Sequence, residues 1–261
     1  MKLLFLFAMN VEAGPTIDGL QLIGPEELPS LPFRIYRGKT ERDDDIVLLT
    51  SGVDPAYGVD NTGIVSAAAM LTAALFLFGK PDVVVNAGTA GGFAAAGSKI
   101  GDVYLGEDYV YHDHRIPIVG TDWPKKGIGG YRMEMPEKLK AMFPTATVTT
   151  GNSLDITVDE KALMLKLAQS CPLVKEMEAA AIAEICTGAG LPFIALKSIT
   201  DIIDGNEVTG VEFMRNLEIA SLRLQEALHE LLKYLYPELV RQIRPGRNRD
   251  LTDKVLRLAE N

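Results

Sequence analysis

The sequence predicts an α/β fold in which a central mixed, mainly parallel β-sheet is flanked by helices. Short apolar runs alternate with helical patterns along the chain. Several of these runs are apolar throughout, as in strands that are covered on both faces. No internal repeat or low-complexity segment interrupts the alternation. At 261 residues the chain can bury one large core. We therefore expect a single α/β domain over residues 1–240 and a C-terminal extension over residues 241–261.

Strands are predicted where runs rich in Leu, Ile, Val and Phe are continuous, and helices where the apolar spacing is helical and Gly or Pro follows. The expected strands, in order, are Leu3–Ala8, Ile46–Thr50, Val83–Asn86, Val103–Tyr111, Ala146–Thr149 and Phe193–Lys197. The expected helices are Asn61–Phe78 (capped by Asn61 or Thr62), Asp159–Gln169, Glu176–Thr187, Val208–Tyr236 and Leu251–Ala259. Because ligands bind beyond the carboxyl ends of parallel strands, the loops after residues 8, 50, 86, 150 and 197 should share one rim.

Composition narrows the range of partners. The formal net charge of -9 argues against binding to nucleic acid or to anionic membranes, both of which require a basic face. No stretch approaches the roughly 18 continuous apolar residues that a membrane span requires. Cys171 and Cys186 form neither a CxxC pair nor a dense disulfide framework. We expect reduced thiols and a cytoplasmic location.

A small-residue segment follows the strand that begins at Val83. Gly88, Gly91 and Gly92 would let the backbone approach a ligand closely or adopt positive φ angles. The spacing matches neither the G-x-G-x-x-G nor the P-loop motif. The segment is either a tight turn or a cradle for a ligand, and in the second case the Thr89 hydroxyl could contact a sugar or a nucleophilic water.

Three carboxylates are candidates for acid–base chemistry. Glu12 follows the first strand, Glu178 lies in the first turn of a predicted helix, and Asp201 follows another strand. Each has an ordinary explanation as a turn, helix-dipole or capping residue. Together, on one predicted rim, they offer a general base, a carboxylate that can bind a vicinal diol, and a desolvated acid. This combination suits the cleavage of a bond to a sugar.

Other kinds of active site are disfavoured. His112 and His114 lie on one side of a predicted strand and could contribute to a zinc site. A third ligand is not evident, however, and Arg115 is adjacent. We expect no metal and no cofactor. The G-x-S-x-G motif of serine hydrolases is absent, and the 151–155 segment imitates it only in part.

Several motifs resemble the 5′-methylthioadenosine/S-adenosylhomocysteine nucleosidases of the nucleoside phosphorylase-like superfamily, and the plant-type methylthioadenosine nucleosidases most of all. The resemblance covers roughly residues 1–236 and leaves the basic tail unmatched. Its specificity lies in the ordered set of motifs, because a single glycine-rich segment would be weak support. The matching segments are Phe7–Glu12, Asn86–Phe93, Gly101–Leu105, His112–Ile118, Thr150–Asp155, Glu176–Ala181 and Thr200–Asp201.

The resemblance implies roles for individual residues. Asp201 is similar to the acid that protonates adenine N7, and Glu12 to the base that activates water. Glu178 resembles the residue that binds the ribose 2′ and 3′ hydroxyls, above Met177. The full set of substrate-binding residues implied is Thr89, Gly91, Leu154, Asp155, Lys175, Glu176, Met177, Glu178, Lys197 and Thr200. Lys197 stands where bacterial members commonly carry Arg.

The activity implied is hydrolysis of methylthioadenosine to adenine and methylthioribose, a step of methionine salvage. A purine nucleoside phosphorylase of the same fold is the alternative. Related phosphorylases carry Arg at the position of Asn86, however, and Glu12 would repel a phosphate dianion. A nucleoside-binding or storage protein is disfavoured because all three carboxylates are present.

The resemblance also implies a homodimer in which the partner lies near the pocket for the 5′-alkylthio group. Candidates for that pocket are Val53, Trp123 and the 208–213 segment. The sequence leaves open whether S-adenosylhomocysteine is also a substrate.

Overall fold

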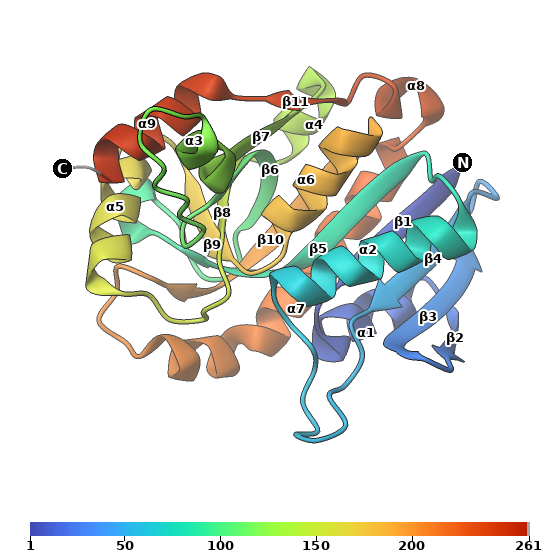
Figure 1. Cartoon of the computed structure of the whole chain (residues 1–261). Helices are drawn as coiled ribbons and strands as arrows, with labels where there is room; N and C mark the ends of the chain where they lie inside the picture. The colour runs from blue at the N-terminus through green and yellow to red at the C-terminus, as the bar shows by residue number, and fades with distance from the viewer. Residues whose placement is uncertain (260–261) are drawn as a thin grey trace.

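The computed structural model describes residues 1–259, and within them eleven strands form a single sheet (Figure 1). The sheet order is β11-β7-β6-β8-β9-β5-β1-β4-β3-β2, and β10 pairs with both β5 and β6. The strands are β1 (Lys2–Phe7), β2 (Ile23–Leu28), β3 (Leu31–Lys39), β4 (Asp45–Thr50), β5 (Val83–Gly92), β6 (Val103–Tyr111), β7 (Gly129–Glu134), β8 (Thr145–Thr150), β9 (Leu173–Glu176), β10 (Phe193–Ile202) and β11 (Arg244–Arg247). The predicted α/β class with a mixed sheet is confirmed.

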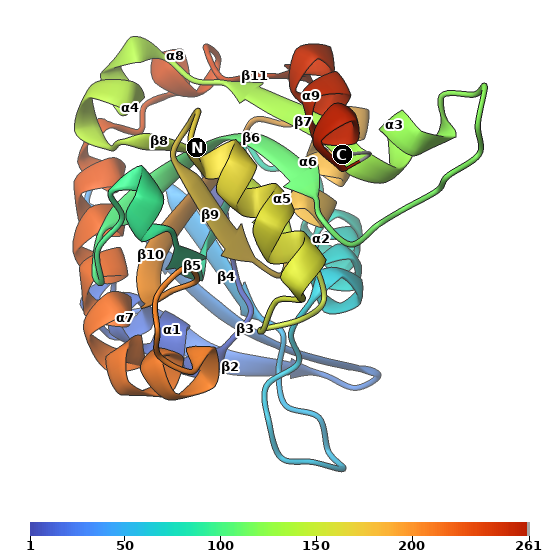
Figure 2. The ribbon, with the colours of Figure 1, turned by 90° about the vertical axis from the view of Figure 1, so that its left-hand side faces the viewer.

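Helices cover both faces of the sheet. Figure 2 shows α7 and α1 on one side of it and α2 and α6 on the other. The helices are α1 (Asn10–Gly19), α2 (Ile64–Phe78), α3 (Trp123–Ile128), α4 (Glu137–Met142), α5 (Val158–Ala168), α6 (Ala179–Ala189), α7 (Thr209–Tyr234), α8 (Pro237–Val240) and α9 (Arg249–Ala259), with a short 3-10 turn at Ala94–Ala96. No helix within residues 1–259 is both long enough and apolar enough to cross a membrane.

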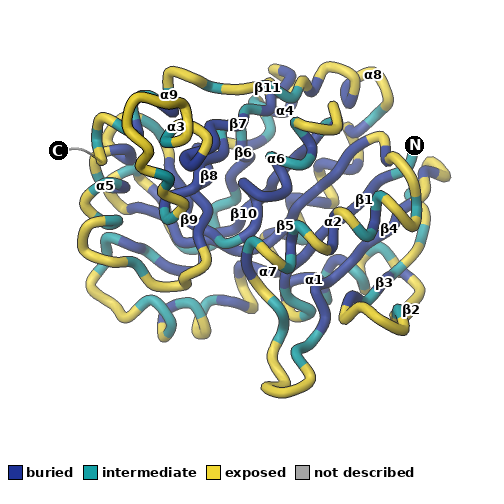
Figure 3. Tube along the Cα trace, in the orientation of Figure 1, coloured by how far each residue is buried: buried dark blue, intermediate teal, exposed yellow. Residues whose placement is uncertain are grey.

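The centre of the sheet is parallel and fully buried. β1 pairs in parallel with β4 and β5, and β5 pairs in parallel with β10. Figure 3 shows these central strands as a buried band inside the molecule. All ten residues of β5 are buried, as are nine of the ten in β10. Strands covered on both faces lack a polar side, which explains why they appear as continuous apolar runs in the sequence.

Two central strands are longer than predicted. β5 continues from Asn86 to Gly92 because Ala195–Ile202 of β10 pairs along this stretch, so the expected glycine-rich loop is wrong. Gly88, Gly91 and Gly92 do not have positive φ angles. β10 likewise continues to Ile202, with an irregularity in its pairing between Ile199 and Asp201. Asp201 therefore lies inside a strand and not after one.

Other boundaries also differ from the prediction. Glu176 ends the short strand β9, whereas the sequence pattern placed it in a helix, and α6 begins only at Ala179. The cap of α2 is Gly63, and not Asn61 or Thr62. Asn61 instead donates its side-chain amide to the carbonyls of Ser51 and Gly52.

The C-terminal segment joins the sheet. β11 pairs antiparallel with β7, and α9 packs near α3, α5 and β7. Arg247 donates to the Gly129 carbonyl at 2.7 Å, and its guanidinium lies 4.1 Å from the centre of the Tyr131 ring. These contacts attach residues 244–259 to the edge of the sheet.

Candidate active site

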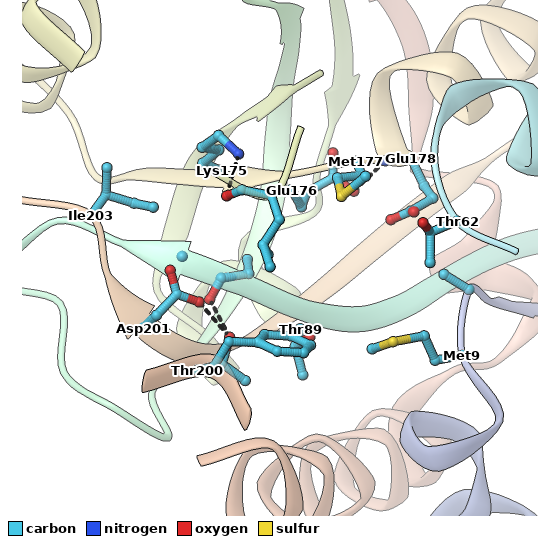
Figure 4. A pocket seen from close by; sticks show the side chains of 15 residues that line it. Met9, Thr62, Thr89, Lys175, Glu176, Met177, Glu178, Thr200, Asp201 and Ile203 are labelled. Carbon is cyan, nitrogen blue, oxygen red and sulfur yellow. Dashed lines mark hydrogen bonds between the residues drawn. The ribbon is translucent and has the colours of Figure 1, made fainter. Parts of the chain in front are cut away.

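A cavity of about 210 Å³ opens at the carboxyl ends of β1, β5, β9 and β10 (Figure 4). The segments after β1, β4 and β8 contribute to its wall, as the predicted rim requires. Its lining residues are Ala8, Met9, Thr62, Thr89, Ala90, Gly91, Leu154, Lys175, Glu176, Met177, Glu178, Thr200, Asp201, Ile203 and Phe213. Most of the charged residues among them are buried acids, so the cavity suits a ligand that carries or develops positive charge.

Glu12 lies behind Thr89 in the first turn of α1. Its Oε1 accepts hydrogen bonds from the Thr89 backbone N–H at 2.7 Å and from the Thr89 hydroxyl at 2.6 Å. Its Oε2 accepts from the Met9 N–H at 3.3 Å. Burial raises the pKa of Glu12, and the Thr89 bonds and the charge of Lys197 oppose this only in part. A carboxylate with a raised pKa is a stronger proton acceptor, which suits a general base.

Lys197 and Glu176 form a fully buried ion pair next to Glu12, with Lys197 Nζ 2.8 Å from Glu176 Oε2. Burial alone would lower the pKa of Lys197, but the charges of Glu176 and Glu178 outweigh it and raise that pKa. Burial alone would raise the pKa of Glu176, but Lys197 reverses the shift and lowers it. Both groups are therefore charged. Gly88 lies beside both groups, because a Cβ there would be in van der Waals contact, at 3.4 Å, with Glu12 Oε1 and with Lys197 Nζ.

Glu178 directly precedes α6 and faces the cavity. Its Oε1 accepts from the Gly63 N–H at 2.8 Å. Burial, reinforced by the negative charge of Glu176, raises the pKa of Glu178 to about 7. Glu176 also accepts from the backbone N–H groups of Glu178 and Ala179, each at 2.9 Å, and so fixes the start of α6. Glu178 is thus held firmly while its second oxygen is available to a ligand.

Asp201 lies at the opposite end of the cavity. Its Oδ1 accepts from the Thr200 hydroxyl at 2.8 Å. Burial raises the pKa of Asp201 despite that hydrogen bond, and the nearby Glu212 adds to the rise. A Cβ at Gly91 would come within 2.7 Å of Asp201 Oδ2, so glycine leaves room for the carboxyl group. A buried carboxyl of this kind can hold a proton and donate it to a ligand.

The structure brings most of the predicted site residues together. Nine of the twelve line the cavity, while Glu12 and Lys197 lie behind that lining and are linked to it by the contacts above. Asp155 is exposed and lies outside the lining. The lining residues that sequence reasoning did not assign to substrate binding are Ala8, Met9, Thr62, Ala90 and Ile203. Ala8, Met9 and Ala90 belonged to the quoted motifs, which could have identified them.

Of the candidates for the 5′-alkylthio pocket, one lines the cavity and two do not. Phe213, from the 208–213 segment, lines the cavity. Val53 forms an isolated bridge with Asp60, and Trp123 is 52% exposed on α3; neither lines the cavity.

The two neighbouring histidines have separate surroundings. His112 is buried, with Nδ1 2.9 Å from the Thr149 hydroxyl, and His114 makes an edge contact with the Tyr111 ring. Residues 1–259 contain no group of three or more His, Cys, Asp and Glu side chains that could hold a metal ion.

Fold and site together define a class of protein. The sequence pattern of the Phosphorylase superfamily matches residues 5–233, which run from β1 almost to the end of α7, and the chain belongs to that superfamily. The match includes Glu12, Glu178 and Asp201, and it ends before the segment that forms β11 and α9.

Within this superfamily, the chain is similar to nucleosidases. The 5′-methylthioadenosine nucleosidase of Arabidopsis thaliana is 34% identical over 238 residues, which cover 90% of this chain and 87% of that protein. The 5′-methylthioadenosine/S-adenosylhomocysteine nucleosidase of the same plant is 33% identical and covers 89% of this chain and 91% of that one. The apo structure of Arabidopsis thaliana 5′-methylthioadenosine nucleosidase superposes with a TM-score of 0.83 at 30% identity, covering 91% of this chain and 98% of that one. The resemblance inferred from the sequence motifs is confirmed.

Proposed function

We propose that the protein hydrolyses the N-ribosidic bond of 5′-methylthioadenosine and releases adenine and methylthioribose. The observation that carries the proposal is that Glu178 and Asp201 line one cavity, with Glu12 directly behind its lining residue Thr89, and that all three have a raised pKa. The similarity to plant nucleosidases supplies the substrate. Each carboxyl group has a different neighbour, and these neighbours suggest different tasks.

Asp201 supplies the proton to the leaving group. As the bond between C1′ and N9 breaks, its electron pair moves into the adenine ring, and the Asp201 carboxyl donates its proton to N7. Burial keeps that proton on Asp201 to a higher pH than an exposed aspartate would allow. Because adenine then leaves as a neutral base, the barrier to cleavage of the C1′–N9 bond is lowered. General acid catalysis has the same effect in inverting glycosidases.

Glu178 and Glu12 act on the sugar side. A sugar that loses its base develops positive charge on C1′ and the ring oxygen, and the ionised Glu178 stabilises that charge while it accepts hydrogen bonds from the ribose diol. Glu12 takes a proton from water as the water oxygen bonds to C1′. One proton leaves Asp201 and one reaches Glu12, so the reaction balances, and exchange with solvent restores both groups.

Water rather than phosphate is the expected nucleophile, and an assay of adenine release tests this. Both lysines at the site already have partners: Lys197 is paired with Glu176 at 2.8 Å and lies beside Glu12, and Lys175 donates to the carbonyls of Ser153 and Leu154. We expect methylthioadenosine to be cleaved at the same rate with and without phosphate. Methylthioadenosine, S-adenosylhomocysteine, adenosine and inosine should be compared in the same buffer. Strict dependence on phosphate would identify a phosphorylase, and binding of methylthioadenosine without cleavage would identify a nucleoside-binding protein.

We also propose that the protein is a homodimer that acts in the cytoplasm, in methionine salvage. Cys171 and Cys186 are free thiols, as a reducing compartment favours, and methylthioribose retains the sulfur of methionine.

An apolar hollow that a second copy of the chain could cover lies between α2 and the turn that joins β2 to β3. It is lined by Leu28, Pro29, Ser30, Leu31, Ala68, Ala69, Thr72, Ala73, Phe76 and Leu77.

Sedimentation can test the dimer. Phe76 is 89% exposed and Val65 is 79% exposed on α2, and such a patch favours association with a second copy. Thr62, just before α2, lines the cavity, so a partner on this face would border the substrate. We expect a dimer for the parent chain and a monomer for Phe76→Glu. Ala162→Glu, on the exposed side of α5, is the control and should remain dimeric. A monomeric parent chain would refute the dimer.

A further inference from the structure

Lys175 is a buried cation in the lining of the cavity, and its hydrogen bonds go to backbone carbonyls and not to a carboxylate. It belongs to β9, is 4% exposed and lines the cavity. Its Nζ donates to the carbonyl of Ser153 and, at 3.0 Å, to the carbonyl of Leu154. A buried ammonium group is costly unless it is hydrogen-bonded, so these two bonds are strongly favoured.

The carbonyls bound by Lys175 belong to a segment without regular structure between β8 and α5. Leu154 of this segment lines the cavity although it is 43% exposed. Asn152 fixes the other end: its backbone N–H donates to Asp113 Oδ2 at 2.8 Å, and its Oδ1 accepts from the Ile64 N–H at 3.0 Å. We call residues 152–154 the cavity wall.

The wall reaches Glu178 through the start of α2. The first amides of a helix have no partner within the helix and must be satisfied from outside. Here Asn152 accepts from the Ile64 N–H and Glu178 accepts from the Gly63 N–H at 2.8 Å. Gly63 has a φ of +92°, and a Cβ there would lie 2.8 Å from Asn152 Oδ1. The two acceptors are therefore packed side by side on adjacent amides.

From this arrangement we infer that Lys175 is a positioning residue for the proposed hydrolysis: it clamps the cavity wall and, through Asn152 and the start of α2, holds Glu178 in place for the ribose. The inference rests on the proposed function for its effect on catalysis. Its effect on the wall is a property of the fold alone.

The charge of Lys175 has a second consequence, at Asp201. Burial lowers the pKa of Lys175, while Asp201, Glu176, Asp155 and Glu160 act in the opposite sense, with Asp201 the strongest of them. Asp201 in turn faces Thr200 on its own strand, Glu212 on α7 and Lys175 on β9, and Lys175 lowers its pKa. The same side chain thus acts on both ends of the cavity, mechanically at Glu178 and electrostatically at Asp201.

Four variants separate these effects: Lys175→Met, Lys175→Arg, Asn152→Ala and the control Lys166→Met, which changes an exposed lysine on α5. We expect kcat/KM for methylthioadenosine to fall roughly 10- to 100-fold in Lys175→Met and in Asn152→Ala. Asp201 must be protonated to act, so loss of the Lys175 charge should move the high-pH limb of kcat/KM to higher pH. Asn152→Ala should leave that limb in place, and Lys175→Arg should keep it in place and recover part of the activity.

Hydrogen exchange gives a readout that does not depend on turnover. The amides of Gly63, Ile64 and Asn152 donate hydrogen bonds in this network. They should exchange at least roughly tenfold faster in Lys175→Met and Asn152→Ala than in the parent chain, and at the parental rate in Lys166→Met. If the parent chain does not cleave methylthioadenosine, the proposed function fails while exchange still decides the clamp. Parental exchange rates in a folded Lys175→Met variant would overturn the inference, as would parental kcat/KM with an unmoved pH limb.

Discussion

Replacement of Asp201 by Asn is expected to reduce kcat for methylthioadenosine roughly 100- to 10,000-fold, the contribution of a general acid. The amide keeps the size of the carboxyl group, and its oxygen can still accept from the Thr200 hydroxyl, which is 2.8 Å from Asp201 Oδ1. It cannot transfer a proton to the departing base. We expect KM to change by only about threefold, because ground-state contacts survive while the transition state is destabilised. Steady-state kinetics on the purified variant provide the measurement.

The pH profile adds a second check on Asp201. Burial raises the pKa of this group, and its protonated form is the active one, so activity should fall as pH rises through that pKa. The limb should disappear in Asp201→Asn. Asp159→Asn, an exposed change on α5, serves as the matched control and should behave like the parent chain. Adenine release by Asp201→Asn at the parental rate would show that another group is the acid.

Glu12→Gln is expected to lower kcat by a similar factor, roughly 100- to 10,000-fold, because the amide cannot accept a proton from the attacking water. The Thr89 N–H and hydroxyl can still donate to the side-chain oxygen, so the local fold should persist. The Met9 N–H, 3.3 Å from Oε2, loses its acceptor if the amide nitrogen takes that place. Rate measurements at saturating substrate test this, with Glu218→Gln on the exposed side of α7 as control.

The sign of the pH effect for Glu12 is opposite to that for Asp201. Glu12 must be ionised to act, and burial raises its pKa, so activity should fall as pH decreases through that pKa. Glu178 must also be ionised, and its pKa of about 7 gives a second loss of activity as pH decreases. In Glu12→Gln the low-pH loss should come from Glu178 alone, and the high-pH limb of Asp201 should stay. A Glu12→Gln variant with parental kcat and an unaltered profile would exclude Glu12 as the base.

Much of the central sheet could be predicted because burial leaves a direct trace in sequence. The runs at Leu3–Ala8 and Ile46–Thr50 are apolar throughout and form β1 and β4. β9 was missed because its four residues, Leu173–Glu176, include two charged side chains that are nevertheless buried. Its identity depends on tertiary partners, namely Lys197 for Glu176 and two backbone carbonyls for Lys175. Local patterns carry no record of such partners.

The candidate site shows the same division. The three carboxylates were predicted from their positions near strand ends and from the motifs around them. The loop and the positive φ angles suggested for the glycines were wrong, since Gly88 and Gly91 lie in an extended strand. Gly91 leaves room there for Asp201. A sequence shows that a residue is small, but not which distant side chain occupies the space beside it. The link from Asn152 to the start of α2 was not foreseen for this reason.

The two outermost strands of the sheet limit how copies of this chain can meet. β11 at one edge contains Pro245 between Arg244 and Arg247, and β2 at the other edge contains Pro25 followed by Glu26 and Glu27. Proline removes an amide from the free side of a strand, and charged neighbours disfavour a flat, apolar template. Extension of the sheet into a second molecule, the first step toward ribbon-like aggregates, is therefore discouraged at both ends, which leaves helix packing as the favoured route to assembly.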